Sequence, residues 1–591
     1  MKSDYLNDLI RIVKPYKTSL IIGLASTIFA SALDVASPML LKFGIDGLQD
    51  HNNLGWLMTI AGLILLAAGV SGIFRYFMRM RVIGISRSVE SDIRDGFFKH
   101  LIGLSPTFFD NNHTGDLMTR ATEDVERVRM VVGPALMYSV STILIISFSG
   151  IMMFYLDPVL SGWVLLLAPM IGTVVFLIAR KLHKANLLQQ EAYSELTNKV
   201  QENLSGIRVI KAYSREDYEL ERFTQHCETY FDRSLLVVKA QAMFMPFLGL
   251  LVGLGIAGIL WVGGHRMADG NLTLGSFIAF ISYLSLMTWP MIALGWVTHL
   301  YQRGSASQKR LDYIHATEPQ FESNSSDHNS ANGTSEPVIE HAPKITFKNL
   351  EMSYKNGKAP ALSGINLTIP AGSVTAIVGS VGSGKSTLAR LLPRLYEADS
   401  GEVLIDELPL ESYGIESLRR SIGYVDQTAF LFSATIKHNI SIGLPDTSQE
   451  DIVQAVRTAC FEEEIETFPD QYETRIGERG VTLSGGQRQR LTLARALLMD
   501  TPILVLDDSL SAVDSDTEAE IISKLKTRMS GQTVLFITHR LAAAESADNI
   551  IVLDEGKLIE SGNHDSLLAD GGLYAEMFKR QRLAEELEVM E

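Results

Sequence analysis

Residues 374–387 read VTAIVGSVGSGKST, and this stretch decides the fold of the C-terminal half of the chain. The apolar run VTAIVG predicts a buried strand, and the LARLLPRL that follows the stretch predicts a helix. Between them lies a glycine-rich loop ending in Gly-Lys-Ser, which in this strand–loop–helix context is the P-loop pattern. Glycines let backbone N–H groups close on phosphate oxygens, and the helix N-terminus adds partial positive charge.

The side chains of this loop predict ATP and Mg²⁺ as ligands. Lys385 is expected to reach the β- and γ-phosphates, and the Ser386 hydroxyl is expected to ligate Mg²⁺. Further on, the run ILVLDD ends a second buried strand at Asp507, where a carboxylate can hold Mg²⁺ through its water shell. On these motifs alone the chain is compatible with any P-loop nucleoside triphosphatase.

Around the loop, residues 343–591 alternate short β-rich runs with helical stretches. The runs are ITFKNLEMSY, VTAIVG, VLID, ILVLDD, TVLFIT and NIIVLD. Strands that alternate with helices predict an α/β sheet domain, and runs such as ILVL are typical of buried central strands. We expect this half to be soluble and cytosolic.

The N-terminal 317 residues have a different pattern. A bilayer-spanning helix needs roughly 20 mostly apolar residues, and six runs qualify: about 18–41, 55–78, 131–156, 159–179, 243–263 and 274–300. They predict an all-α transmembrane domain with six spans. A soluble ATPase would lack such spans.

The charge of the loops predicts the orientation. Long polar stretches rich in Lys and Arg separate the second run from the third and the fourth from the fifth, whereas the opposite loops are short and nearly free of positive charge. The positive-inside rule then places both termini and the nucleotide-binding domain in the cytoplasm, with the spans in the cytoplasmic (inner) membrane.

Three further features complete the division of the chain. Residues 318–342 are polar, rich in Ser and Asn and punctuated by Pro, as linkers are. The amphipathic N-terminal 20 residues predict an interfacial helix and not a signal peptide. The formal net charge of -16 argues against nucleic-acid binding, and two cysteines, Cys227 and Cys460, support neither a disulfide framework nor a thiolate metal cluster.

Residues 483–490, LSGGQRQR, resemble the signature sequence of ATP-binding cassette (ABC) proteins. The loops TGDLMTRATEDVERV (114–128) and SGIRVIKAYSREDYE (205–219) resemble the intracellular loops of bacterial multidrug-type ABC exporters, so the resemblance covers nearly the whole chain. It implies ATP-driven export of amphipathic or hydrophobic compounds, drugs or lipids, with ATP hydrolysis coupled to transport. It also implies that the two loops form coupling helices, one of which docks on the partner's cassette.

The resemblance assigns roles to individual residues. It implies that Tyr354 stacks on adenine, that Gln427 is the Q-loop residue beside Mg²⁺, and that His539 is the switch histidine. Arg475–Gly480 resembles the exporter X-loop, and Ser511–Asp514 the D-loop. The remaining expected nucleotide-site residues are Gly379, Ser380, Gly382, Gly384, Lys385, Ser386 and Thr387, with Ser386, Gln427 and Asp507 as the metal set. Taken singly, Tyr354 is also explained as a strand aromatic and His539 as a polar residue at a strand end.

The family's cassettes meet head to tail, so the chain is expected to dimerise. Each ATP lies between the P-loop of one cassette and the signature of the other, here Ser484, Gly485, Gly486 and Gln487. With one membrane domain and one cassette, this chain needs a second half-transporter. Closing the two cassettes on ATP would then draw the coupling helices together and turn the cavity outward.

One position departs from the family's pattern. The catalytic base of the family is a Glu directly after the Mg²⁺ carboxylate, whereas this sequence has Asp507-Asp508. Asp508 is one methylene shorter, and a displacement of about 1 Å can cost on the order of 10²-fold in rate. The substitution resembles one chain of heterodimeric exporters with a degenerate ATP site. A tolerated change in a homodimer is the alternative.

The sequence does not identify the transported compound. Phe247, Phe280, Tyr283 and Trp289 either line a pocket for amphipathic compounds or face lipid and neighbouring helices. Asp34, in the first span, either selects cationic cargo or pairs with Arg75. A homodimeric lipid flippase is the rival to a drug exporter, and an importer subunit is disfavoured because spans and cassette are fused.

Overall fold

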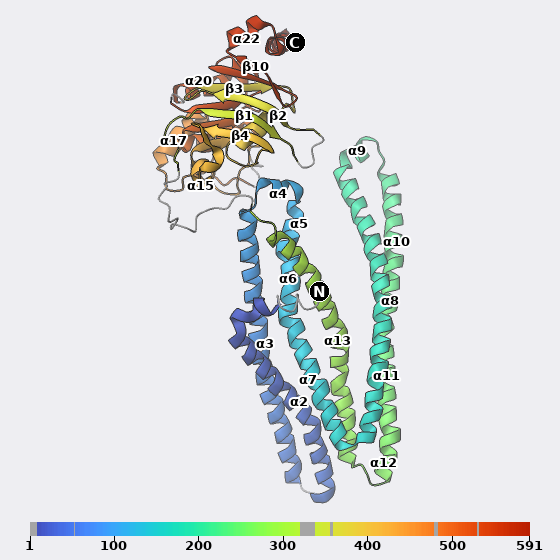
Figure 1. Ribbon diagram of the computed structural model, residues 1–591. Helices are drawn as coiled ribbons and strands as arrows, with labels where there is room; N and C mark the ends of the chain where they lie inside the picture. Colours follow the sequence, from blue (N-terminus) through green and yellow to red (C-terminus); the bar gives the residue numbers. More distant parts are fainter. Residues whose placement is uncertain are drawn as a thin grey trace. The chain divides into compact units, whose positions relative to one another are not determined.

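The computed structural model describes residues 9–51, 54–319, 337–354, 359–477, 483–528 and 531–590. The chain divides into two compact units (Figure 1). The helical unit comprises Met1–Ile102 and Asn112–Glu318, and the sheet unit comprises Gly103–Asn111 and Pro319–Glu591. The short segment 103–111 therefore belongs with the C-terminal half, although the sequence places it between two expected membrane spans.

The described elements of the helical unit are all helices. They include a 3₁₀ turn, η1, and three π-helical turns, η2 to η4, which interrupt longer α-helices. The elements are η1 (Lys14–Tyr16), α2 (Lys17–His51), α3 (Leu54–Ile102), α5 (Thr114–Thr119), η2 (Arg120–Asp124), α6 (Val125–Met130), η3 (Val131–Ala135), α7 (Leu136–Leu156), α8 (Pro158–Ser205), α9 (Ile207–Ala212), α10 (Glu216–Ala242), α11 (Phe244–Gly258), η4 (Ile259–Gly263), α12 (Gly264–Ala268) and α13 (Leu274–His315).

Five helical segments among the described residues are long and apolar enough to cross a membrane: Leu9–Leu48, Gly55–Ile102, Thr114–Leu156, Glu216–Ala268 and Leu274–His315. They contain five of the six expected runs. The fourth run, 159–179, falls in α8, and several of its side chains lie outside the described residues.

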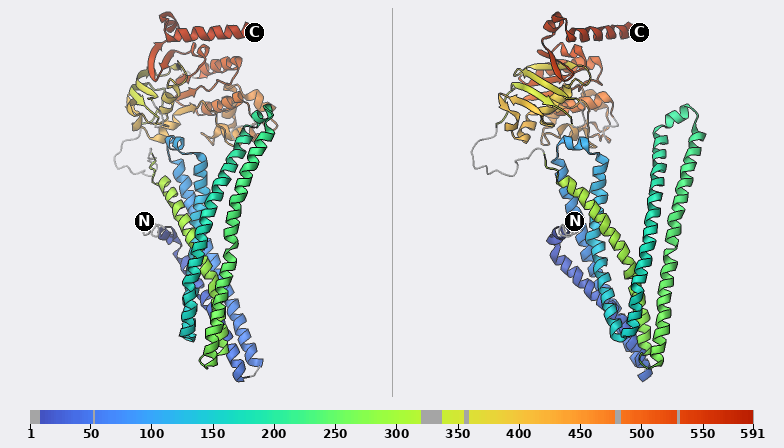
Figure 2. Two further views of the ribbon diagram at one scale, coloured as in Figure 1. Left: turned by 90° about the vertical axis from the view of Figure 1, so that its right-hand side faces the viewer. Right: turned by 45° about the vertical axis from the view of Figure 1, so that its right-hand side comes forward.

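Local sequence explains where these helices begin. Asp157 is the N-cap of α8, and its side chain accepts a hydrogen bond from the Leu160 N–H while Pro158 occupies the first turn. The helix then continues far past the expected span, and α8 and α10 lie side by side as a long antiparallel pair (Figures 1 and 2). The polar stretches between the spans are thus extensions of the helices, as the sequence predicts.

The core of the helical unit lies where α7, α8 and α13 meet. Phe280 and Tyr283 of α13 are fully buried there, together with Leu160 and Ile259. The Tyr283 hydroxyl donates to the Val35 carbonyl oxygen at 3.0 Å, which ties α13 to α2.

The sheet unit contains ten described strands and helices on both sides of them. The strands are β1 (Ile345–Met352), β2 (Leu362–Ile369), β3 (Val374–Gly379), β4 (Ser400–Ile405), β5 (Leu408–Pro409), β6 (Ile422–Val425), β7 (Ile503–Asp507), β8 (Thr533–Ile537), β9 (Asn549–Asp554) and β10 (Lys557–Gly562). The helices are α4 (Pro106–Asn111), α14 (Lys385–Leu391), η5 (Leu410–Ser412), α15 (Ile415–Arg420), α16 (Ile436–Ser441), α17 (Gln449–Thr458), α18 (Glu462–Thr467), η6 (Gln471–Glu473), α19 (Gly485–Leu498), α20 (Ser515–Arg528), α21 (Leu541–Ala544), α22 (His564–Asp570) and α23 (Leu573–Met590).

Two sheets form the frame of this unit. The larger has the order β10-β9-β3-β8-β7-β6, in which all neighbours are parallel except β10 with β9. The smaller, β2-β1-β4-β5, is antiparallel. β7 and β8 are buried along their whole length, in agreement with their continuous apolar sequences.

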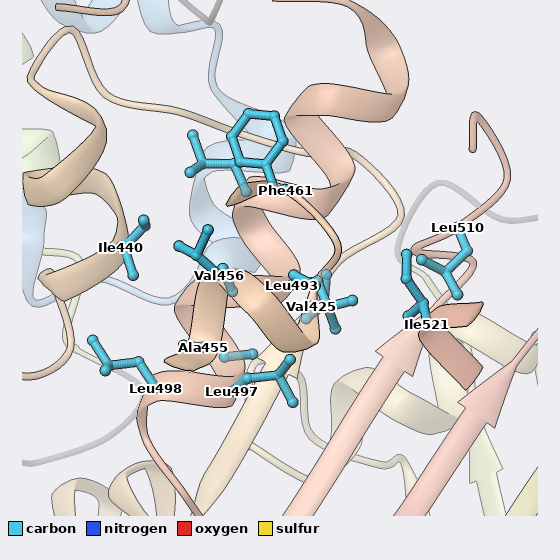
Figure 3. Packing of buried hydrophobic residues seen from close by; sticks show 14 of the residues in the cluster. Val425, Ile440, Ala455, Val456, Phe461, Leu493, Leu497, Leu498, Leu510 and Ile521 are labelled. Carbon is cyan, nitrogen blue, oxygen red and sulfur yellow. The ribbon is translucent and has the colours of Figure 1, made fainter. Parts of the chain in front are cut away.

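A separate apolar cluster holds the helices that follow β6. Figure 3 shows Ile440 of α16, Val456 of α17 and Leu493 of α19 in this cluster, close to Val425 of β6. The packing fixes α19 in the sheet unit, and with it the signature sequence at the helix's N-terminus.

Candidate functional site

The expected catalytic and phosphate-binding residues follow neighbouring parallel strands. The P-loop follows β3, His539 lies just after β8, Asp507 and Asp508 stand at the end of β7, and Gln427 lies just after β6. Because the carboxyl ends of parallel strands share one edge of the sheet, the fold brings these residues to one edge.

Two glycines let the P-loop pass close to other backbone. Gly379 has φ +147°, and a Cβ there would lie 1.9 Å from the Leu553 carbonyl oxygen of β9. Gly384 has φ +96°, and its Cβ would lie 2.5 Å from the Ala361 carbonyl oxygen. A side chain at either position would displace the loop, so the sequence needs glycine here for the tight turn into α14.

Lys385 is buried inside the loop that it belongs to. Its residue is 5% exposed, and its Nζ donates to the carbonyl oxygens of Gly379 at 3.0 Å and Ser380 at 2.7 Å. Burial lowers the pKa of Lys385, and the nearby carboxylates of Asp507 and Asp508 oppose that shift. The side chain is therefore held where the loop wraps an expected phosphate.

The Ser386 hydroxyl and the Asp507 carboxylate are joined directly. The hydroxyl donates to Asp507 Oδ1 at 2.8 Å, while Oδ2 of the same fully buried side chain has no hydrogen-bond partner among the described residues. Burial raises the pKa of Asp507, and the Ser386 hydrogen bond opposes this. An orphaned buried carboxylate oxygen beside a hydroxyl is a donor set that fits Mg²⁺, which commonly takes one or two protein carboxylates and completes its shell with water and phosphate.

Asp508 is held in an unusual backbone conformation. Its φ is +46°, its residue is 8% exposed, and its N–H donates to the Ile537 carbonyl oxygen of β8 at 2.9 Å. The Gln427 side chain donates from Nε2 to Asp508 Oδ2 at 3.3 Å. The structure thus brings the Q-loop residue to Asp508, next to the Ser386–Asp507 pair.

His539 is exposed, and the residue after it anchors its loop. Arg540 forms an ion pair with the buried Glu518 of α20 and donates to the Ser511 carbonyl oxygen at 3.4 Å. Burial raises the pKa of Glu518, and Arg540 opposes that shift. These contacts tie the histidine loop to the D-loop. Sequence reasoning missed Glu518 and Arg540, because no local pattern links residues in these two segments.

Tyr354 lies half-buried after β1, beside the helix that follows the P-loop. Its hydroxyl lies 3.2 Å from the Thr387 hydroxyl, and its ring meets that of Tyr396 edge-on with centroids 5.4 Å apart. The structure thus places Tyr354 next to the P-loop helix, and its stacking on adenine stays a prediction.

The signature residues begin α19. Ser484 and Gln487 form a capping box, in which the side-chain oxygen of each residue accepts a hydrogen bond from the backbone N–H of the other. A Cβ at Gly485 would lie 3.3 Å from Ala512 Cβ, and one at Gly486 would lie 2.8 Å from the Ala512 carbonyl oxygen. The two glycines thus let the D-loop pack on the start of α19.

Further contacts make the signature and the D-loop one block. The Gln489 side chain donates to the Ser511 hydroxyl at 3.0 Å and accepts from the Ala512 N–H at 2.8 Å. Asp514 accepts from the Thr517 N–H at 2.9 Å, and this hydrogen bond lowers the pKa of Asp514. Of the expected X-loop, Arg475 pairs with Thr435 in a β-bridge, and residues 478–480 lie outside the described residues.

The sheet unit also receives a helix from the N-terminal half. Asp110 in α4 accepts a hydrogen bond from the Tyr396 hydroxyl at 2.7 Å, and this contact raises the pKa of Tyr396 together with burial. α4 belongs to the first of the two long polar stretches. Sequence reasoning expected coupling helices at 114–128 and 205–219, and neither range includes α4. It also missed Tyr396, whose surroundings carry no motif.

The candidate cargo residues of the helical unit separate into two groups. Phe280 and Tyr283 are fully buried, whereas Phe247 is 42% and Trp289 64% exposed in the chain alone. Asp34 accepts hydrogen bonds from Arg75, with both oxygens at 2.8 Å, and from the Ser71 hydroxyl at 2.7 Å. Of the two alternatives for Asp34, the structure shows the pairing with Arg75.

Comparison with known proteins gives consistent matches over both units. The family model described as "ABC transporter transmembrane region" matches residues 20–291, and the one described as "ABC transporter" matches residues 362–511. The chain is 34% identical over 570 residues to the "Multidrug resistance-like ATP-binding protein MdlA" of Escherichia coli (strain K12), covering 95% of this chain and 94% of that protein. It is 33% identical over 593 residues to the "ATP-dependent lipid A-core flippase" of Syntrophus aciditrophicus (strain SB), covering 99% and 96%.

A solved structure shares the fold of the whole chain. It is described as "Structure of a bacterial Atm1-family ABC exporter with ATP bound", and it superposes with a TM-score of 0.79 at 25% identity. The match covers 96% of this chain and 98% of that one. Both the helical and the sheet unit are therefore found together in a known exporter.

Proposed function

Since this chain belongs to the bacterial multidrug-type ABC exporters, with a helical transmembrane domain fused to an ATP-binding cassette, we propose that it is the degenerate-site half of a heterodimer. ATP hydrolysis by the cassettes drives export of drugs or lipids across the membrane. The partner in this proposal is a different half-transporter that carries the catalytic Glu. In this proposal the membrane is the cytoplasmic membrane, with the cassette on its cytosolic side.

The observation that carries the proposal is Asp508 at the position of the family's Glu. Its backbone is held by β8, through the 2.9 Å hydrogen bond to Ile537, so the main chain is not free to move the shorter side chain forward. A carboxylate set back by roughly one bond length holds the attacking water out of line with the γ-phosphate, and a displacement of about 1 Å can cost on the order of 10²-fold. Hydrolysis at this chain's own P-loop is therefore slow.

The residues expected to bind the nucleotide are all present, so the site is proposed to bind ATP although it hydrolyses ATP slowly. Lys385 lies in the loop as a source of charge for the β- and γ-phosphates, and backbone N–H groups at the start of α14 face the same region. Ser386 and Asp507, with Gln427 nearby, would hold Mg²⁺. When bound, Mg²⁺ would offset the negative charge of the phosphates.

The intact signature serves the other site in this proposal. Ser484 is the N-cap of α19, and two glycines follow it. These small residues allow a phosphate to approach the positively charged N-terminal end of the helix. The hydrogen bonds of Gln489 to the D-loop hold this helix start in place. In this proposal the chain's own P-loop forms the ATP site that hydrolyses slowly, and its signature completes the partner's ATP site, which hydrolyses rapidly.

The cargo proposed is an amphipathic or hydrophobic compound. Relatives are named for multidrug resistance and for flipping lipid A-core, and both kinds of cargo are amphipathic or apolar. Arg75 neutralises the charge of Asp34, so this carboxylate does not select cationic cargo in the proposed function. The rival is a homodimeric lipid flippase, and assays in liposomes with a lipid and with a dye as cargo separate the two.

Purification from native membranes tests the proposal. A tagged copy of this chain should bring down a second half-transporter with Glu after its Mg²⁺ carboxylate, in equal amount. Recovery of this chain alone, as a dimer with rapid and substrate-stimulated ATP turnover, would contradict the heterodimer.

A further inference from the structure

An apolar cavity of about 450 Å³ lies beneath the N-terminal segment of the helical unit. One wall comes from Leu9, Ile10 and Val13 of that segment, and the facing wall from Val131 and Val132 of η3 and Leu136 of α7. Its volume falls within the range of roughly 300 to 1,000 Å³ that is typical of small-molecule pockets. It is separate from the nucleotide site, which belongs to the other unit.

The cavity is built into the fold. The Tyr16 hydroxyl donates to Asp92 Oδ2 of α3 at 2.6 Å, and Val13 packs with Ile85 and Val89 of the same helix. These contacts hold the N-terminal segment against the bundle. On the other side, η3 is a π-helical turn, and such turns displace the following side chains from regular helical register. The walls are thus fixed from both sides.

Two lysines stand at the edge of the cavity. Lys14 and Lys17 contribute to its lining, both are exposed, and neither forms an ion pair within the part of the chain that the structure describes. The described lining residues include no Asp or Glu. An apolar cavity with uncompensated positive charge at its edge is complementary to a ligand with an apolar body and an anionic head.

The position of the lysines identifies the source of such a ligand. The apolar run of the first span begins at about residue 18, directly after Lys17. Basic residues next to a span on its cytosolic side lie at the depth of lipid phosphates, and anionic lipids are concentrated there. A soluble anion would gain nothing from the apolar walls of the cavity. The side chain of Ile10 is 60% exposed and adds a further apolar surface that a lipid can contact.

We propose that this cavity binds one anionic phospholipid of the cytosolic leaflet as a resident ligand. An acyl chain occupies the space between Val13 and Leu136, and the headgroup phosphate lies between Lys14 and Lys17. Because the lining also includes Leu20 of α2 and Tyr301 of α13, the lipid contacts α2, η3, α7 and α13 at once. Bound lipid therefore stabilises their packing. The proposal does not depend on what the exporter carries.

The test uses the assembled transporter in nanodiscs of phosphatidylcholine. Increasing mole fractions of a phosphatidylglycerol with a diazirine at the end of one acyl chain are added, and the photolabelled peptides are identified by mass spectrometry. We expect label on the peptide that contains Val131–Leu136. Each Lys near an anionic surface contributes roughly fivefold in affinity. Lys14→Gln with Lys17→Gln should therefore raise the half-maximal mole fraction by at least roughly tenfold.

Two further variants keep the test specific. Lys181→Gln with Lys184→Gln removes the same charge from two exposed lysines of α8 and should leave this labelling unchanged. Leu136→Trp fills the cavity and should abolish the label while both lysines remain. Retained ATPase activity and a single peak in size exclusion show that each variant is folded.

Three outcomes would overturn the proposal. The first is equal labelling by a phosphatidylcholine carrying the same diazirine. The second is labelling that is unchanged in the Lys14 and Lys17 double variant. The third is displacement of the label by soluble glycerol phosphate, which would mean that the lysines bind free phosphate and not a lipid.

Discussion

The Ser386 hydroxyl donates a 2.8 Å hydrogen bond to Asp507 Oδ1, and so joins the first turn of α14 to the end of β7. In the part of the chain that the structure describes, the other oxygen of the buried Asp507 has no hydrogen-bond partner. The two side chains come from segments 121 positions apart, and the parallel sheet alone brings them together. Under the proposed function this pair keeps a place for Mg²⁺ and phosphate, although the sequence has Asp508 and not Glu after Asp507.

The pair predicts how nucleotide affinity depends on Mg²⁺. Asp507→Asn keeps the size of the side chain and an acceptor for Ser386 but removes the negative charge. We expect Mg²⁺ to strengthen ATP binding at this site in the unchanged chain and to have little effect in the variant. Titration of a fluorescent ATP analogue with Mg²⁺ and with excess chelator measures this. An equal gain from Mg²⁺ in both proteins would exclude Asp507 as part of the metal site.

Lys385→Ala should weaken nucleotide binding at this chain's P-loop. Hydrogen bonds to charged groups contribute about 1.5 to 3 kcal/mol, which corresponds to a loss of roughly 10- to 100-fold in affinity. Labelling by a photoreactive ATP analogue, mapped to this chain, checks the loss. Total binding by the complex should fall only in part, since the second site remains. Unchanged labelling of this chain would contradict the role of Lys385.

Tyr396→Phe should weaken the coupling between ATP turnover and transport. It removes only the hydroxyl that donates to Asp110 of α4, and the net contribution of such a hydrogen bond is about 1 kcal/mol. We expect transport and substrate-stimulated ATPase to fall severalfold while ATP affinity is unchanged. Asp110→Ala is the matched variant, because it removes the acceptor of the same hydrogen bond. If both variants transport at the normal rate, the contact is not needed for coupling.

The Asp34–Arg75 pair predicts a pattern of thermal stability. Arg75→Gln leaves an intramembrane carboxylate without its partner and should lower the melting temperature of the purified transporter by several degrees. Asp34→Asn combined with Arg75→Gln should recover most of the loss, because no charge is then left unpaired. A double variant as unstable as the sum of the single ones would show that the two side chains act independently.

The fold was predictable from the sequence wherever a helix or strand has a continuous apolar run. The strands β3, β7 and β8 and the long apolar helices were predicted correctly. An element that is apolar on all sides has a continuous apolar sequence, and this run can be recognised without knowing what packs against it. β2, Leu362–Ile369, was not predicted, since its buried and exposed residues alternate and its sequence is polar in part. The edge strand β10, Lys557–Gly562, was not predicted either, because none of its residues is buried and it has no apolar run.

The candidate site was predictable in its motifs but not in the contacts between them. The P-loop, the signature and the Asp507-Asp508 pair are local patterns. Tyr396 and Asp110 are 286 positions apart, and Glu518 and Arg540 lie in segments without a shared motif, so only the fold brings them together. For Asp34 the sequence left two alternatives, and the distance to Arg75 distinguishes them.

Steady-state ATPase of the purified complex, with Gly485→Asp and Asp508→Asn introduced in turn, tests the degenerate-site proposal most directly. In the proposed heterodimer Gly485 completes the partner's ATP site, so a charged side chain there should nearly abolish turnover. Under the same proposal Asp508→Asn removes a base that is already set back, and turnover should fall less than about threefold, whereas loss of a competent general base costs roughly 10²- to 10⁴-fold. Binding of ATP at this chain's P-loop should persist in both variants. Equal and near-total loss of turnover from both substitutions would contradict the degenerate site and indicate a homodimer in which each substitution affects two equivalent sites.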